Sequence, residues 1–207
     1  MCRLILKPVI LTVSICISVV IWLASWPYFS INKNSSIPYL TGRETYMDGL
    51  FSSGLYLHAM FSPIILVLAA IQLTYPKNIA HRLLGVAYIV LILLSVPGAL
   101  ILAYHAYGGI WVQFNLFALT ACWIGFTAMG VVQLLKRQWD AHRRFMLRSG
   151  VLTFSAIALR LMSYVGENFL NISNADYYPL YTLLNWLPIL IGVEIYIRHF
   201  NRSSAYL

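Results

Sequence analysis

Charged residues are scarce in this sequence, and acidic residues are the scarcest. Of 207 residues only 10% are charged, with 14 lysines and arginines against six aspartates and glutamates, whereas 60% are hydrophobic. Soluble domains carry about 25% charged residues, so most of this surface must face lipid. The net charge of +8 does not indicate nucleic-acid binding, because the basic residues lie in short breaks between apolar runs and not on one amphipathic face.

Cysteine is nearly absent as well. Cys2, Cys16 and Cys122 follow no regular spacing, which makes a disulfide framework or a thiolate metal centre improbable. Histidine is the only residue type left in sufficient number to bind a metal, and the only metal that the sequence suggests is the iron of a haem.

The sequence does contain long apolar runs. Six of them are long enough to cross a bilayer, which takes about 20 residues as a helix. Helix is the expected state because every backbone polar group must be satisfied inside lipid. We therefore predict an all-α integral membrane protein forming a single transmembrane domain. The first run resembles a signal peptide, but its long apolar core predicts a retained anchor. The six predicted spans are residues 9–28, 54–75, 83–104, 111–135, 145–164 and 178–197.

The basic residues predict the orientation of these spans. If the N-terminus is cytoplasmic, only Lys33 and Arg43 lie outside, and Arg160 lies within the fifth span. Positive charge concentrates on the cytoplasmic side of membrane proteins, so both termini are predicted to be cytoplasmic. Eleven basic residues then lie inside: Arg3, Lys7, Lys77, Arg82, Lys136, Arg137, Arg143, Arg144, Arg148, Arg198 and Arg202.

One pattern occurs twice. Ile71-Gln72-Leu73 is followed, after six residues, by Ala80-His81-Arg82, and Val132-Gln133-Leu134 is followed in the same way by Ala141-His142-Arg143. Matched positions are 61 residues apart throughout. Each copy joins one span to the next, so the second and third spans should repeat as the fourth and fifth. We predict two parallel two-helix repeats that build a central four-helix bundle, with the first and sixth spans outside it.

The repeated histidines are the first candidate site. His81 and His142 each begin a span, and Arg82 and Arg143 follow them directly. Cations at a helix N-terminus oppose the helix dipole, so an anion is expected nearby. Lipid phosphate is one candidate. The other is haem b between the repeats, with two axial imidazoles and with propionates that the arginines would neutralise.

A second group of polar residues lies near the outer face. His58 and His105 could form an outer pair of ligands. Along the third span, however, His81 and His105 are about 36 Å apart, which weakens the case for two haems in electron transfer. Arg160 and Glu167 are predicted to form a buried polar site, because an arginine within a span needs a partner or a cavity. A purely structural arginine bonded to carbonyls or to Glu167 is the alternative.

The remaining acidic residue of the spans has a simpler interpretation. Glu194 and Arg198 are four residues apart in the sixth span, a spacing that predicts a local ion pair.

The second to fifth spans resemble a known family. His58, the run His81-Arg82-Leu83-Leu84-Gly85-Val86-Ala87-Tyr88, the run from His142 to Ser149 and Arg160 are similar to bacterial multi-pass membrane proteins catalogued as domain of unknown function 2306. The resemblance covers about two thirds of the chain and implies a location in the bacterial inner membrane, but no activity. There is a looser similarity to four-helix b-type cytochromes, from which the chain departs because its fourth span has no histidine.

Three functions are compatible with these features. The first is a small redox or haem-binding membrane protein with His81 and His142 as ligands, served by a redox partner or a quinone. The second is a small transporter, or a lipid- or anion-binding protein, that uses Arg160 and the histidines. The third is a non-catalytic membrane assembly partner. The sequence identifies no catalytic residue, and the lipid bilayer is the one partner common to all three.

Overall fold

The computed structural model describes residues 2–25, 49–75, 80–170 and 174–203, and all regular structure within these ranges is helical. The chain divides into two compact units, Met1–His105 and Ala106–Leu207. The division falls between the two copies of the repeated pattern, so each unit contains one copy. Lys33, Arg43 and Lys77, which contributed to the predicted orientation, lie outside the described residues.

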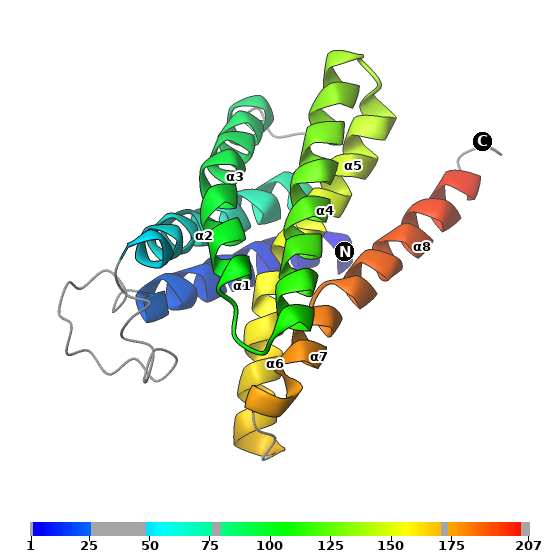
Figure 1. Cartoon of the computed structure of the whole chain (residues 1–207). Helices are drawn as coiled ribbons and strands as arrows, with labels where there is room; N and C mark the ends of the chain where they lie inside the picture. Colours follow the sequence, from blue (N-terminus) through cyan, green and yellow to red (C-terminus); the bar gives the residue numbers. More distant parts are fainter. Residues whose placement is uncertain (1, 26–48, 76–79, 171–173, 204–207) are drawn as a thin grey trace. The chain divides into compact units, whose positions relative to one another are not determined.

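The first unit consists of α1 (Cys2–Ser25), α2 (Leu50–Thr74) and α3 (His81–Tyr104), with α2 in contact with both of the others (Figure 1). On α1, the buried positions Ser14, Ser18 and Ile21 are three and four residues apart and lie on one face. Two of the three are serines. Small residues allow close approach of helices in membranes, where apolar contact alone gives little advantage over lipid.

The antiparallel pair of α2 and α3 is tightest near Gly54 and Gly98. A Cβ atom added at Gly98 would lie 2.4 Å from the carbonyl oxygen of Gly54 and 2.9 Å from the backbone nitrogen of His58. A Cβ at Gly54 would lie 2.7 Å from the side chain of Ile101. Glycine at both positions therefore lets the two backbones meet. Pro63 lies inside α2 and Pro97 lies inside α3.

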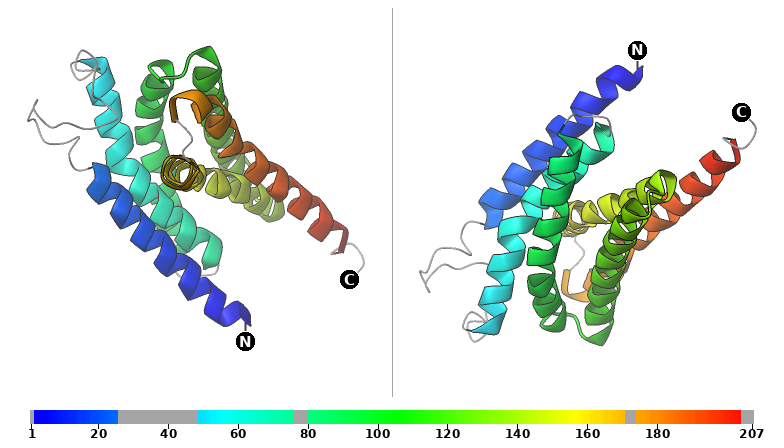
Figure 2. Two further views of the ribbon diagram at one scale, coloured as in Figure 1. Left: turned by 90° about the horizontal axis from the view of Figure 1, so that it is seen from below. Right: turned by 90° about the horizontal axis from the view of Figure 1, so that it is seen from above.

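The second unit consists of α4 (Ile110–Leu135), α5 (Trp139–Thr153), α6 (Ser155–Phe169), α7 (Asn174–Leu184) and α8 (Leu187–Ser203). Helix α4 contacts α5 and α7, α5 also contacts α8, and α6 contacts α7 (Figure 2).

Hydroxyl groups hold α4 against α5. Thr127 and Ser149 share a hydrogen bond of 2.7 Å, and the indole nitrogen of Trp123 donates to the hydroxyl of Thr153 at 3.1 Å. All four side chains are buried. Such bonds between membrane helices stabilise the pair by about 1 kcal/mol each.

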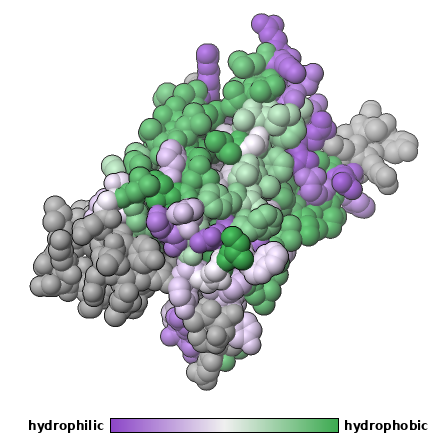
Figure 3. All heavy atoms as spheres, in the orientation of Figure 1, coloured by the Kyte–Doolittle hydropathy of each residue, from purple (hydrophilic) through white to green (hydrophobic). Residues whose placement is uncertain are grey.

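The predicted membrane architecture is confirmed, with added detail. Among the described residues, five helical stretches are long and apolar enough to cross a membrane, and α1 adds the shorter apolar stretch Leu11–Leu23. Green, hydrophobic residues cover most of the surface in Figure 3. The fifth and sixth predicted spans are each divided in two: α5 ends before Phe154, and α7 and α8 are separated by Asn185 and Trp186.

Burial inside each unit follows the repeat. Six residues of α4 are buried, and five of the six positions that lie 61 residues earlier in α2 are buried too. The sixth, Ser62, is half-buried. The two copies thus use the same face for packing, whereas their association into one four-helix bundle stays a prediction. The matched positions are Phe51 and Val112, Gly54 and Asn115, Ala59 and Thr120, Ser62 and Trp123, Leu66 and Thr127, and Ala69 and Gly130.

The contact at Gly98 can be tested with a matched pair of substitutions. We expect Gly98→Ala to lower the free energy of unfolding by about 1–3 kcal/mol, because the new methyl group meets backbone atoms that cannot move aside. Gly125→Ala is the control, since a Cβ there has nothing within 4 Å. It should be neutral or stabilising. Thermal unfolding in detergent measures both, and equal effects would contradict the close approach of α2 and α3.

Candidate functional site

His142, in the first turn of α5, has a fixed ring. Its Nδ1 lies 2.8 Å from the carbonyl oxygen of Gly130 on α4. A carbonyl only accepts, so Nδ1 carries the proton and the neutral ring has its lone pair on Nε2. Glycine at position 130 also admits the neighbouring side chain, since a Cβ there would lie 2.6 Å from the sulfur of Met146. The imidazole is thus oriented, with Nε2 as its available acceptor or ligand.

A tight turn brings His142 to this position. Arg137 adopts φ 57°, in the left-handed region that favours glycine. The backbone N–H of Gln138 donates to the carbonyl of Gln133 at 2.9 Å, and that of Arg137 donates to Leu134, also at 2.9 Å. This pair of bonds is a Schellman motif, which ends α4 and satisfies its last carbonyls. Helix α5 then returns along α4 and places its first turn beside Gly130.

In the first unit, the hydrogen bond between the two helices of the hairpin comes from a glutamine and not from the histidine ring. Nε2 of Gln72 donates to the carbonyl oxygen of His81 at 2.9 Å, which ties the last turns of α2 to the start of α3. A Cβ atom added at Gly85 would lie 3.4 Å from Nε2, in ordinary van der Waals contact with this amide. His81 and His142 are both half-buried, and Arg82 and Arg143 beside them are exposed.

The two glutamines of the repeat share one unusual property. The Oε1 atoms of Gln72 and Gln133 are both buried, and neither accepts a hydrogen bond from the described residues. A buried acceptor without a donor costs about 1–3 kcal/mol. The same unbonded oxygen occurs at matching positions in both copies, so we include the two glutamines in the candidate site. The sequence contained the signal, since Gln72 and Gln133 were among the repeated residues, but no role was assigned to them.

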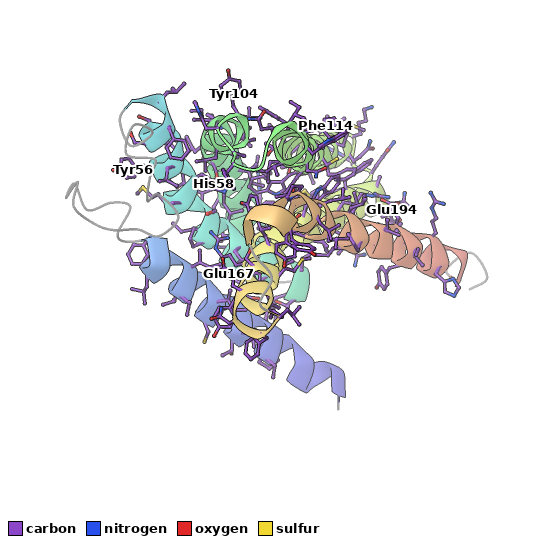
Figure 4. All side chains as sticks on the ribbon, turned by 60° about the horizontal axis from the view of Figure 1, so that its bottom comes forward. Tyr56, His58, Tyr104, Phe114, Glu167 and Glu194 are labelled. Carbon is purple, nitrogen blue, oxygen red and sulfur yellow. The ribbon has the colours of Figure 1, made fainter. Side chains whose placement is uncertain are left out.

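His58 and His105, the predicted outer pair, lie at different levels of the α2–α3 hairpin. Nδ1 of His58 is 3.0 Å from the buried hydroxyl of Ser95. The ring of His105 packs edge-on against Phe51, with ring centroids 5.8 Å apart. Phe51 is seven residues from His58, or about 10 Å along α2. The structure therefore does not bring these two rings together around one ion. Figure 4 labels His58 on α2.

The predicted buried polar site at Arg160 and Glu167 has a different character in the structure. Both residues belong to α6 and both are exposed. Nη1 of Arg160 donates to the carbonyl of Ala156, one turn back, at 3.1 Å. This bond agrees with the structural alternative, in which the arginine satisfies backbone carbonyls. Ser149 and Thr153, which come earlier in the predicted fifth span, are buried, and the break at Phe154 separates them from Arg160 and Glu167.

The main charged contact of the second unit was not predicted. Arg148 on α5 forms two parallel hydrogen bonds with Glu194 on α8, from Nε to one carboxylate oxygen and from Nη2 to the other, the latter at 2.9 Å. Within the described residues, Glu194 thus forms its ion pair with Arg148 and not with Arg198 as expected, although the charge of Arg198 also acts on this carboxylate. A planar guanidinium matches a carboxylate in this geometry, and a fixed partner on another helix outweighs a mobile one on the same helix. Figure 4 shows Glu194 on α8.

Aromatic rings complete the environment of this ion pair. The guanidinium carbon of Arg148 lies 5.2 Å from the ring centre of Phe145 and 5.8 Å from that of Phe126. Its side chain is only 14% exposed, against 33% for Glu194. An ion pair within membrane spans is rare and costly, which makes it a candidate for function. The rule that charges inside a membrane pair with each other could have identified it.

Comparison with known proteins identifies the family. A family model described as "Predicted membrane protein (DUF2306)" matches residues 55–197, more than half of the chain. The chain belongs to the DUF2306 family. The matched region begins in α2 and ends in α8. No curated protein and no solved structure matches this DUF2306 protein.

Among its described residues, no three His, Cys, Asp or Glu side chains form a group able to hold a metal ion.

The ion pair can be tested with a double-mutant cycle. We expect Arg148→Ala and Glu194→Ala each to lower the free energy of unfolding by about 3 kcal/mol, because each leaves a half-buried charge without its partner. The double variant should lose less than the sum of the two, with a coupling of about 1–3 kcal/mol. Thermal unfolding in detergent provides the measurement. Arg198→Ala, tested with and without Glu194→Ala, is the control and should show no comparable coupling.

Proposed function

We propose that this DUF2306 protein is a haem-binding redox protein of the membrane, with Nε2 of His142 as one axial ligand. The observation behind the proposal is the hydrogen bond from Nδ1 of His142 to the carbonyl of Gly130. Histidines that ligate metals almost always donate their other ring N–H to a carbonyl or carboxylate. That bond fixes the tautomer and the direction of the ring, and it makes Nε2 a better donor to iron.

The second ligand in this proposal is His81, and it comes from the repeat. His81 stands 61 residues before His142, in the first turn of α3 as His142 is in the first turn of α5. Gln72 holds the backbone of His81 through its carbonyl. Paired imidazoles of this kind are typical ligands of b-type haems. The proposal does not use His58 and His105.

The arginines next to the two histidines would bind the propionates. Arg82 and Arg143 are both exposed in the structure, so their guanidinium groups are accessible to an anion. Arginine forms two parallel bonds with a carboxylate, which favours it over lysine for this task. Haem b would supply one-electron transfer, and the chain would contribute the ligands, their orientation and the cations. A redox partner or a quinone would complete the reaction.

An absorbance spectrum tests this function directly. Protein purified in detergent after expression with added haem should show a Soret band that sharpens on reduction. His142→Ala and His81→Ala should each remove or shift that band, because each leaves the iron with one axial ligand. His199→Ala is the matched control. His199 is exposed on α8 and is not part of the repeat, so the spectrum should not change.

Two results would contradict the proposal. One is a wild-type protein that binds no haem in this experiment. The other is a Soret band that survives both His142→Ala and His81→Ala unchanged, which would place any haem elsewhere. Thermal unfolding of the same variants shows whether a lost band reflects a lost ligand or a lost fold.

A further inference from the structure

Helices α5 and α8 align four charged residues in register. Arg148 and Glu194 face each other across the pair of helices. The helices run in opposite directions in this predicted topology, α5 outward and α8 inward. Arg144, one turn before Arg148, and Arg198, one turn after Glu194, therefore lie at the same level. Residues four apart share a helix face, so all four lie along the side where α5 meets α8.

Positive charge exceeds negative charge along this line. Three arginines stand beside one carboxylate, and Arg148 occupies both oxygens of that carboxylate. Within the described residues, neither Arg144 nor Arg198 forms an ion pair. Asp140 lies one turn before Arg144, in the first turn of α5, where its negative charge interacts favourably with the helix dipole. Counting Asp140 as well, the group still has an excess of one positive charge. Purple, hydrophilic residues follow this side of the unit in Figure 3.

Arg148 has a fixed position at the deep end of the group. Glu194 occupies its Nε and Nη2, and the rings of Phe126 and Phe145 pack on the guanidinium. A guanidinium held in this way loses little conformational freedom when it binds a further anion. Its Nη1 forms no hydrogen bond with the described residues. An anion between Arg144 and Arg198 would then meet one rigid cation and two adaptable ones.

We propose that Arg144, Arg148 and Arg198 form a binding site for a phosphate group. Phosphate fits because its oxygens accept bonds from several guanidinium groups at once and its charge compensates the excess of positive charge. The group could belong to the head of an anionic phospholipid at the predicted cytoplasmic interface, or to inorganic phosphate. The site lies entirely within the second unit and is independent of the proposed haem site.

Two variants with the same change of charge test the proposal. The first is Arg144→Gln/Arg198→Gln, which removes two of the three arginines but keeps the Arg148–Glu194 pair. The control is Lys136→Gln/Arg137→Gln, which removes two exposed positive charges elsewhere in the second unit. Native mass spectrometry with phosphatidylglycerol, against phosphatidylcholine, measures lipid binding. Isothermal titration with inorganic phosphate, against chloride at equal ionic strength, measures binding of the free anion.

We expect wild type and control to bind a phosphate-bearing ligand alike, and Arg144→Gln/Arg198→Gln to bind it about tenfold or more weakly. Loss of phosphatidylglycerol binding alone identifies a lipid head group as the source, and loss of inorganic phosphate binding identifies the free anion. The proposal is overturned if both double variants weaken binding equally, since net charge alone would then explain it. It is overturned as well if wild type binds neither ligand. Thermal unfolding of both double variants at the wild-type temperature confirms that the fold is intact.

Discussion

Both units depend on the close contact between two antiparallel helices, α2 with α3 and α4 with α5. Apolar side chains gain little by leaving lipid for one another, so membrane helices associate through small residues that let backbones meet and through hydrogen bonds between them. In the first unit Gly54 and Gly98 provide the close approach. In the second, Thr127 and Ser149 provide a buried hydrogen bond. The second helix of each pair has a histidine in its first turn, His81 in α3 and His142 in α5, so the candidate site depends on this contact.

The two copies keep the same packing positions but fill them differently. Leu66, Tyr88 and Ile92 are buried in the first copy, and Thr127, Ser149 and Thr153 are buried 61 residues later. Gly85 on α3 corresponds to Met146 on α5, and Ala69 on α2 corresponds to Gly130 on α4. In the second copy the large side chain of Met146 packs on Gly130, whereas in the first copy both positions are small and Gly85 faces the amide of Gln72.

Hydropathy and repetition were sufficient to predict the spans and the internal repeat, because lipid leaves helix as the only economical state for a long apolar run. The interruptions were not predictable in the same way. At Phe154 no proline or glycine marks the end of α5, and its backbone N–H turns to Val151, three residues back. At Asn185 and Trp186 the sequence does contain a signal, since Pro188 has no N–H to continue the helix. The length of an apolar run does not reveal either break.

Only some residues of the candidate site could be identified from the sequence. Repetition identified His81 and His142, and it also contained Gln72 and Gln133, whose buried oxygens only the structure shows. The partner of Glu194 could not be chosen by spacing, because Arg198 on the same helix satisfies the spacing rule as well as any residue. The packing of α5 against α8 places Arg148 next to Glu194, so these two residues form the ion pair. Local periodicity predicts which face a residue occupies, but it does not predict which helix covers that face.

The ion pair is also a difference between the two copies of the repeat. The residue of α3 that corresponds to Arg148 is Ala87, so the first copy has no charge at this position. An arginine at this depth in α5 is costly without a carboxylate, and a lone carboxylate at the level of Glu194 would be costly without the arginine. Each residue therefore requires the other. Helix α8, which supplies the carboxylate, belongs to the same unit as α5. The hydroxyl groups, the oriented His142 and the excess of arginine occur in the same unit, which makes it the part of this protein where chemistry is best sought.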